Sequence, residues 1–394
     1  MATVVISPCN VVNSIDVGGH FWVYMQYTQA LRRLGCEVYW LEQFSSSGDE
    51  DRDAAMLETF FKRMERYGLG GKTILYTSEE QKNERENDNR APLEYLGVTA
   101  EQAKAVFQRA DLLLNFQYKI DPALLSCFRR TALVDIDPGL LQFWITTGQL
   151  FVPQHDLYFT TGETVGTLSA GFPDCGLPWI HIRPPICLEL WPYTYNPNCE
   201  AFTTVSSWWG ETDWITIGKK IIYVNTKRAS FLEFVELPHG TRQVIELALF
   251  LGKGDEKDQR VLESHGWRIR HSRAVCATPE MYQSYIQQSR GEFSCAKPSC
   301  MKFQNAWISD RTLCYLASGK PAVVQNTGPS SFLPNGEGMF RFSALKEATD
   351  ALATINADYE RHCRAAREIA EAYFDAKQVL ERILSIALHS GSHS

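Results

Sequence analysis

Short apolar runs that alternate with helical patterns are the feature that most constrains how this chain can fold. In the first part of the sequence the runs lie at residues 4–6, 37–41, 74–76, 111–116, 132–137 and 157–161. Several of them, such as the three leucines at 112–114, are apolar on both faces, which is typical of parallel strands covered by helices on both sides. We therefore predict that the chain begins with a doubly wound α/β domain.

A proline-rich segment at residues 183–192 interrupts this alternation. Its three prolines prevent regular strand pairing, so we expect a linker between two domains and a hinge for domain closure. Strand candidates then resume at residues 202–205, 221–224, 247–251, 267–269, 291–295 and 322–325. The length of 394 residues also favours two domains over one.

The pattern divides the chain into four parts. We predict a Rossmann-like domain at 1–182, the linker at 183–192, a second Rossmann-like domain at 193–345 and a helical segment at 346–394. A helical pattern from about residue 345 to 388 predicts one long closing helix, and the terminal HSGSHS is expected to be flexible.

Charge and cysteine content narrow the classes of function. The chain has 39 Lys and Arg against 46 Asp and Glu, a net charge of −7, which disfavours general binding of nucleic acid or of an anionic membrane. No apolar window is long enough to span a bilayer, and the N-terminus shows no signal-peptide pattern. The 11 cysteines, an odd number without zinc-site spacing, are typical of reduced thiols. We expect a cytoplasmic protein without a structural metal site.

Gly18, Gly19 and His20 follow the first strand and open the first predicted helix. Two glycines let the backbone approach a ligand closely, and amides at a helix N-terminus favour an anionic group. The imidazole of His20 can accept a proton near neutral pH, which makes His20 a candidate base. The alternative is a histidine that only bonds to backbone at the start of the helix.

Asp135 and Asp137 end the run at 132–137, at the sheet edge where doubly wound folds bind ligands. Asp135 is a candidate catalytic residue that would orient His20 and stabilise its charge. Asp137 precedes Pro138, and Asp-Pro is a common helix start, so we predict that Asp137 caps the next helix.

Two neighbouring cations in the second half suggest a phosphate site. Lys227 and Arg228 directly follow the strand candidate at 221–224. Cations at this position would stabilise the charge that develops on a departing diphosphate. The alternative is a solvated surface turn.

The stretch 291–328 contains a second anion-binding signal. Ser309 or Asp310 begins a predicted helix, and Gly319 ends it. The helix N-terminus favours phosphate, Asp310 would bind ribose hydroxyls, and Lys297 or Lys302 in the preceding loop would add charge. The alternative reading makes Asp310 and Arg311 a cap with an exposed ion pair.

Aromatic residues supply candidate walls for an acceptor pocket. Trp208, in a Trp-rich segment, would stack on a ligand or pack in the core. Phe143, Trp144 and Gln149 would line a pocket on the first domain.

Three stretches resemble the GT-B glycosyltransferases, a family that transfers sugars from nucleotide donors. YLASGKPAVVQNTG at 315–328 is similar to that family's donor region, where a helix ending in a Gly-Lys/Arg-Pro turn leads into a Val-rich strand. AAREIAEAYFDAKQVLERIL resembles its C-terminal helix, and Gly18-Gly19-His20 resembles its acceptor-side loop. The resemblance implies two α/β domains that face a cleft, with the long C-terminal helix bridging them.

The resemblance also assigns roles to residues. It makes His20 the base or acceptor-positioning group, and it places Thr327 and Gly328 near the sugar or its phosphates. The residues that it places around the nucleoside diphosphate are Lys227, Arg228, Ser309, Asp310 and Arg311. The acidic E-x7-E pair of retaining members is absent before the Gly-Lys-Pro turn, so the stereochemistry stays open.

The resemblance implies a glycosyltransferase that moves a sugar from a nucleotide sugar, such as a UDP-sugar, to an acceptor hydroxyl. The nucleotide sugar is a co-substrate, and we expect no cofactor and no divalent metal. The expected acceptor is a small molecule, nucleic acid is disfavoured, and the protein would be a monomer or homodimer. The alternatives are a sugar-nucleotide epimerase of the same fold and a non-catalytic protein that binds nucleotide sugars.

Overall fold

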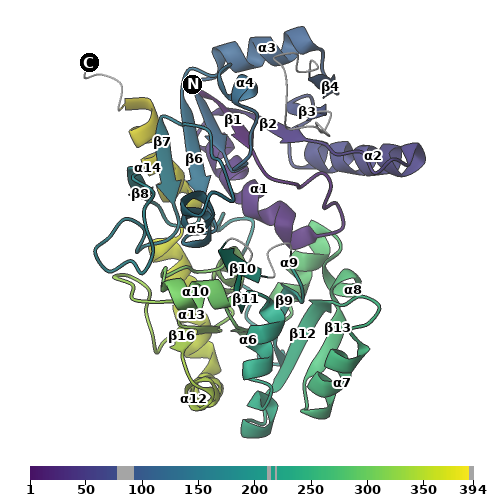
Figure 1. The fold of residues 1–394 in the computed structure, drawn as a ribbon. Helices are drawn as coiled ribbons and strands as arrows, with labels where there is room; N and C mark the ends of the chain where they lie inside the picture. Colours follow the sequence, from purple (N-terminus) through teal and green to yellow (C-terminus); the bar gives the residue numbers. More distant parts are fainter. Residues whose placement is uncertain (78–92, 211–213, 218–219, 390–394) are drawn as a thin grey trace.

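The computed structural model describes residues 1–77, 93–210, 214–217 and 220–389. The loop predicted at 78–91 and the tail beyond residue 389 lie outside the described residues. Two sheets organise the chain, and in Figure 1 the N-terminal sheet belongs to the upper body and the C-terminal sheet to the lower one.

The N-terminal sheet has the strand order β4-β3-β2-β1-β5-β6-β7-β8. Its strands are β1 (Thr3–Ser7), β2 (Glu37–Gln43), β3 (Thr73–Thr77), β4 (Glu94–Leu96), β5 (Leu112–Asn115), β6 (Thr131–Asp135), β7 (Leu157–Thr160) and β8 (Trp179–His181). All neighbours are parallel except β3 and β4. The apolar runs therefore form the predicted parallel sheet, whereas the short edge strands β4 and β8 were not predicted.

Five helices lie between these strands in the part of the chain that the structure describes. They are α1 (Gly18–Arg33), α2 (Glu50–Arg66), α3 (Ala100–Arg109), α4 (Pro122–Leu125) and α5 (Leu140–Thr146). The side chain of Asp137 does not cap α5, contrary to the prediction. The capping contact is made by Gln142, whose Oε1 accepts the Gly139 N–H at 2.6 Å.

The C-terminal sheet is wholly parallel in the order β13-β12-β9-β14-β15-β16. Its strands are β9 (Ala201–Ser207), β12 (Val244–Phe250), β13 (Arg268–His271), β14 (Gly291–Ser294), β15 (Ala322–Gln325) and β16 (Met339–Phe342). The strand predicted at 221–224 does not join this sheet. It belongs to β11 (Lys220–Val224), which pairs antiparallel with β10 (Trp214–Ile217).

Helices cover this second sheet and continue to the C-terminus. They are α6 (Lys227–Glu233), the 3-10 turn η1 (Leu237–Gly240), α7 (Glu256–Ser264), α8 (Ser272–Cys276), α9 (Pro279–Gln287), α10 (Pro298–Phe303), α11 (Asp310–Ala317), α12 (Leu345–Ala357), α13 (Tyr359–Tyr373) and α14 (Ala376–His389).

The closing segment is three helices, not the one long helix that its periodicity predicts. The backbone leaves the helical conformation at Asp358, and the carboxylate of Asp375 accepts the Lys377 N–H, which starts α14 anew. Helix α13 packs against α11 of the lower body, and α14 packs against α1 of the upper one. The chain thus returns to its first domain at its end.

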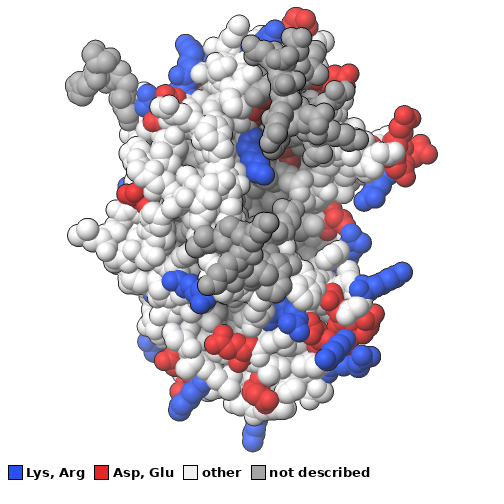
Figure 2. Space-filling model, in the orientation of Figure 1, with Lys and Arg blue, Asp and Glu red and all other residues white. Residues whose placement is uncertain are grey.

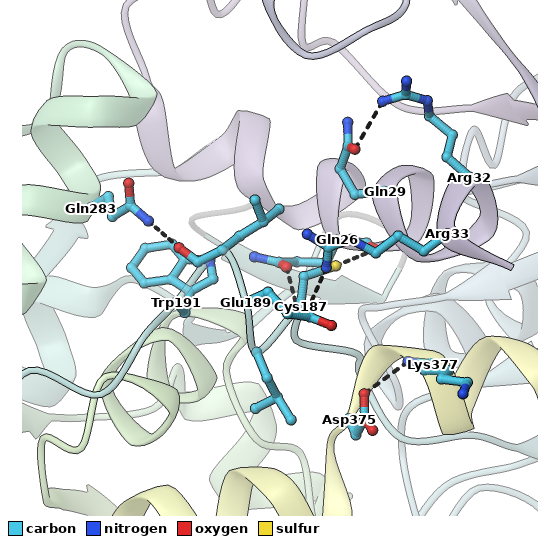
Figure 3. Close-up of polar contacts among 12 residues, drawn as sticks. Gln26, Gln29, Arg32, Arg33, Cys187, Glu189, Trp191, Gln283, Asp375 and Lys377 are labelled. Atoms are coloured by element: carbon cyan, nitrogen blue, oxygen red, sulfur yellow. Dashed lines mark hydrogen bonds and ion pairs between the residues drawn. The ribbon is translucent and has the colours of Figure 1, made fainter.

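The segment at 183–192 is a packed crossover, and Figure 3 shows its polar contacts. The N–H of Cys187 donates to Gln26 of α1 at 2.8 Å, and Gln283 of α9 donates to the Leu190 carbonyl. Ile186 exchanges backbone hydrogen bonds with Phe374 and Ala376, where the chain crosses back. The segment at 183–192 and the return segment around residues 374–376 therefore hold each other in place.

One apolar cluster continues through both bodies. The indole of Trp191 lies 5.2 Å from that of Trp22 on α1 and 6.2 Å from the ring of Tyr282 on α9, measured between centroids. All three side chains are buried. The bodies therefore share a core around the crossover, and this shared core fixes how the edges of the two sheets face each other.

Candidate active site

The carboxyl edges of the two sheets meet at the boundary between the bodies. Asn305 Nδ2, before α11, donates to the carbonyl of Pro138 at 2.6 Å, and the Ser331 N–H donates to Glu163 at 2.6 Å. Phe303 packs its ring 6.1 Å from that of Phe143. These contacts bring the loops after β6, β7, α10 and β15 together, where α/β folds bind ligands.

A narrow cavity of about 20 Å³ lies on the C-terminal side of this boundary. Its lining includes Cys295 and Ala296 after β14, Trp307 and Ser309 before α11, and Thr327 after β15. We call it the donor-side pocket. The hydroxyl of Ser309 accepts the Arg311 N–H at 3.2 Å, so Ser309 caps α11 as predicted, and the helix N-terminus opens at this pocket.

Lys227 is a buried cation beside the donor-side pocket. It begins α6 after the cap Thr226, its side chain is 8% exposed, and its ammonium donates to the carbonyl of Cys295. The ammonium also lies 6.0 Å from the centre of the Trp307 ring. Burial, followed by the nearby charge of Arg311, lowers the pKa of Lys227 to about 7.

Arg311, whose side chain is 11% exposed, is a second cation in this region and lines the donor-side pocket. Its guanidinium pairs with the buried carboxylate of Glu292 at 2.8 Å and donates to the carbonyl of Val205 at 3.0 Å. One oxygen of Glu292 has no hydrogen-bond partner. The carboxylate of Glu292 balances the charge of Arg311, so protonation of Lys227, whose pKa is about 7, leaves excess positive charge in a space of low dielectric.

His20 stands at the boundary, on the first turn of α1. Its Nε2 lies 2.7 Å from the carbonyl oxygen of Cys9, which can only accept, so Nε2 carries the proton of the neutral ring and Nδ1 the lone pair. Burial raises the pKa of Asp310 on α11, and Arg311 and His20 partly offset that rise. His20 of the first domain thus acts electrostatically on Asp310 of the second.

Gly18 and Gly19 pack closely against α9 and the residue before it. A Cβ on Gly18 would lie 2.2 Å from the carbonyl oxygen of Thr278, and one on Gly19 would lie 2.7 Å from the ring of Tyr282. Close packing therefore explains why both positions are glycine. Their predicted phosphate contact stays a prediction.

A larger pocket of about 580 Å³ lies on the N-terminal side, and we call it the acceptor-side pocket. Polar residues that follow the strands line it, among them Asn10 after β1, Gln43 at the end of β2, Gln117 after β5 and Asp137 after β6. Trp144 of α5 contributes an aromatic wall, as predicted. Cys9 also lines it, so His20 is one hydrogen bond from this pocket.

Asp135, predicted to be catalytic, is buried and lines neither pocket, and its catalytic role stays a prediction. Asp135 is 0% exposed, and its carboxylate accepts from Gln142 at 2.9 Å and from Thr160 at 2.8 Å. Burial raises its pKa to about 7. Asp137, two residues on, is exposed and lines the pocket, with Tyr118 Oη 3.3 Å from its carboxylate.

Two further predicted site residues, Arg228 and Trp208, make structural contacts with Asp258. Arg228 points to α7, where its guanidinium binds both carboxylate oxygens of Asp258. Trp208 is 0% exposed, and its indole N–H donates to the same Asp258. Both side chains therefore hold α7 in place through Asp258. Neither of them lines either pocket.

Three other predicted residues, Lys297, Thr327 and Gly328, lie in the loops around α10, α11 and β15. Lys297 precedes α10 as its N-cap residue, with no capping hydrogen bond from its side chain. Thr327 donates its hydroxyl to the Trp307 carbonyl at 2.6 Å. Gly328 has a φ of 133°, and a Cβ there would lie 2.5 Å from the carbonyl of Gln304. Phe143, a predicted acceptor-side residue, packs against Phe303 instead of lining the pocket.

Sequence reasoning missed most of the acceptor-side pocket. Gln43, Gln117 and Asp137 each come at or just after the end of a buried strand. The rule that ligands bind at the carboxyl edge of such a sheet would have selected these positions. Asp137 was assigned to capping because Asp-Pro pairs commonly start helices.

No group of three or more His, Cys, Asp or Glu side chains within the described residues is placed to hold a metal ion. Within the same residues, no helix combines the length and the hydropathy that crossing a membrane requires. All 11 cysteines are free thiols.

Comparison with solved structures shows which known folds this chain resembles. An alpha-glucosyltransferase in complex with UDP and a 13-mer DNA superposes with a TM-score of 0.58 at 11% identity, covering 98% of this chain and 99% of that one. Anabaena HepE in complex with UDP and glucose gives 0.58 at 9% identity, with 99% and 100% covered. Sucrose-phosphate synthase from Thermosynechococcus elongatus gives 0.57 at 12% identity, and both chains are fully covered at 100%.

The chain has the GT-B fold. The predicted fold class is thereby confirmed, since two parallel-sheet bodies align with these glycosyltransferases over their whole length. No family model matches the chain, and no curated protein matches it in sequence. At 9–12% identity the three alignments identify the fold, and the chemistry has to be argued from the pockets.

Proposed function

We propose that this protein is a glycosyltransferase that moves a sugar from a nucleoside-diphosphate sugar to an acceptor hydroxyl. The observation that carries the proposal is the pair of cations beside the N-terminus of α11, the buried Lys227 and the largely buried Arg311. Excess positive charge in a buried pocket favours an anion, and a diphosphate has the charge to match it. Two of the aligned structures contain UDP, which supports a uridine nucleotide.

The reaction would use the boundary between the two pockets. The acceptor oxygen forms a bond to the anomeric carbon of the donor, and the bond from that carbon to the diphosphate oxygen breaks. The diphosphate leaves with the electron pair, and Lys227 and Arg311 stabilise its charge. The hydroxyl proton passes to the imidazole of His20. We propose that these cations take the role that a divalent metal plays in other enzymes of phosphate chemistry.

The acceptor-side pocket favours transfer over the two alternatives. An epimerase of this fold needs only the nucleotide sugar, and a binding protein needs no base. Here a cavity of about 580 Å³ lies one hydrogen bond from His20, which gives a second substrate a place beside the candidate base. This arrangement has a use only when two substrates react.

The test is calorimetric binding of UDP, with GDP and ADP as competitors, with and without EDTA. We expect UDP binding that EDTA leaves unchanged, and a loss of affinity of about thirtyfold or more in Lys227→Met, because the substitution removes a desolvated charge partner. Lys346→Met is the matched control, since Lys346 forms a surface ion pair with Asp350 on α12. Absence of nucleotide binding, or equal affinity in both variants, would overturn the proposal.

A further inference from the structure

The acceptor-side pocket differs in chemistry from any surface built to bind phosphate. Among its described lining residues, Lys119 is the one cation and Asp137 the one anion, so their formal charges cancel. Four carboxamides, those of Asn10, Gln43, Gln117 and Gln149, make up much of the remaining lining. A phosphorylated or nucleic-acid acceptor would need several Lys or Arg side chains at this place.

Carboxamides match a ligand that carries many hydroxyl groups. Each amide offers two N–H donors and one carbonyl acceptor, and a sugar hydroxyl both donates and accepts. The side chain of Gln117 is held by Tyr76, whose hydroxyl donates to its Oε1 at 3.1 Å, and the backbone N–H of Gln117 donates to the side chain of Asn115 at 2.9 Å. A fixed amide recognises a hydroxyl at little entropic cost.

Trp144 and Asp137 complete this lining. Trp144 presents an aromatic surface from α5 on which the apolar C–H face of a sugar ring can pack. Asp137 offers carboxylate oxygens that accept from hydroxyls, and Tyr118, which also lines the pocket, lies with its Oη 3.3 Å from that carboxylate. A lipid acceptor would require a mainly apolar lining, which a carboxylate and four carboxamides do not provide.

The wider surface agrees with a neutral acceptor. On the face shown in Figure 2, the described Lys, Arg, Asp and Glu side chains are interspersed and form no broad patch of one sign. The pocket's volume of about 580 Å³ lies in the range of small-molecule sites and has room for a short oligosaccharide.

We propose that the acceptor-side pocket binds a neutral carbohydrate, with its hydroxyls on the carboxamides and Asp137 and one ring face on Trp144. This inference rests on the proposed function, since the bound sugar becomes an acceptor only beside a nucleotide-sugar donor. The neutral sugar enters the reaction through a hydroxyl near His20, whose Nε2 bonds to the pocket residue Cys9.

The test measures sugar binding separately from donor binding. Saturation-transfer NMR on the full chain would use maltose, cellobiose, lactose and trehalose as neutral probes, with glucose 6-phosphate and a DNA duplex as anionic ones. We expect transfer to at least one neutral disaccharide and none to the anionic probes. In Trp144→Ala the disaccharide affinity should fall by about tenfold.

Two further variants keep the result interpretable. Asp137→Asn preserves shape and should weaken the same disaccharide by several fold, which covers the case in which Trp144→Ala fails to fold. Trp209→Ala is the matched control, because Trp209 is 45% exposed and lies on the other body. Its disaccharide affinity should equal that of the wild type.

The remaining outcomes of this experiment decide whether the inference holds. Preference for glucose 6-phosphate or DNA would overturn the inference, and so would disaccharide binding that is equal in Trp144→Ala, Asp137→Asn and the wild type. UDP binding measured on the same samples distinguishes the two proposals. Without UDP binding the proposed function fails, whereas sugar binding that depends on Trp144 would still establish the site.

Discussion

The two pockets that meet at the domain boundary use opposite physical means to select a ligand. The donor-side pocket is narrow, and protonation of Lys227 beside it leaves excess positive charge there. The acceptor-side pocket is wide, its formal charges cancel and carboxamides line much of it. Buried charge selects a ligand by sign, whereas carboxamides select by the position of hydroxyl groups. In the proposed reaction the two substrates would therefore be selected by different physical means.

His20 is the base in the proposed reaction, and its removal gives the largest expected effect. We expect His20→Ala to lower the turnover number by about 10²–10⁴-fold, the range that a positioned base contributes. Affinities for UDP and for the acceptor should remain within a few fold, because neither pocket loses a lining residue. Initial rates of UDP release and calorimetry on the same sample measure both quantities.

His181→Ala is the matched control for that experiment. The Nε2 of His181 also lies 2.7 Å from a backbone carbonyl, that of Val165, but His181 is on the edge strand β8 and lines neither pocket. Its turnover number should match that of the wild type. Equal turnover in His20→Ala and His181→Ala would mean that His20 is not the base.

Salt gives a smaller effect that separates the pockets directly. Raising sodium chloride from about 0.05 to 0.5 M should weaken UDP binding by several fold, because ions screen the attraction between diphosphate and the cations. The affinity for a neutral disaccharide should stay unchanged within error, since no net charge is involved. Salt dependence of both affinities, or of neither, would contradict the comparison between the pockets.

Sequence periodicity predicted the parallel sheets well, because strands buried on both faces leave uninterrupted apolar runs. The orientation of neighbouring side chains could not be predicted in the same way. Lys227 and Arg228 are adjacent in one helix, yet Lys227 bonds to the carbonyl of Cys295 and Arg228 to the carboxylate of Asp258. A single sequence does not reveal where Asp258 will lie, because that depends on how α7 packs.

The same limit explains why Asp137, predicted to cap a helix, lines the acceptor-side pocket, whereas Asp135, predicted to be catalytic, is buried. Both residues lie at or just after the carboxyl end of a strand, where such folds bind ligands. Asp135, however, is the last residue of β6, and its side chain is buried. Gly18 and Gly19 show a related limit. Their small size is required by Thr278 and Tyr282, residues more than 250 positions away that only the folded chain brings near.

Proton uptake on UDP binding tests the central claim most directly. Burial holds the pKa of Lys227 at about 7, so at about pH 8 most of the free protein carries a neutral amine, whereas UDP is fully ionised. A bound diphosphate favours the charged amine and raises its pKa, so binding must take up a proton. Below about pH 6 the amine is charged in both states, and Lys227 contributes no uptake.

Calorimetry in two buffers of different ionisation enthalpy measures this uptake at about pH 8. We expect uptake by the wild type and none by Lys227→Arg, whose side chain stays charged while still binding the nucleotide. UDP binding without proton uptake in the wild type, or with equal uptake in Lys227→Arg, would contradict the assignment of Lys227 to the diphosphate.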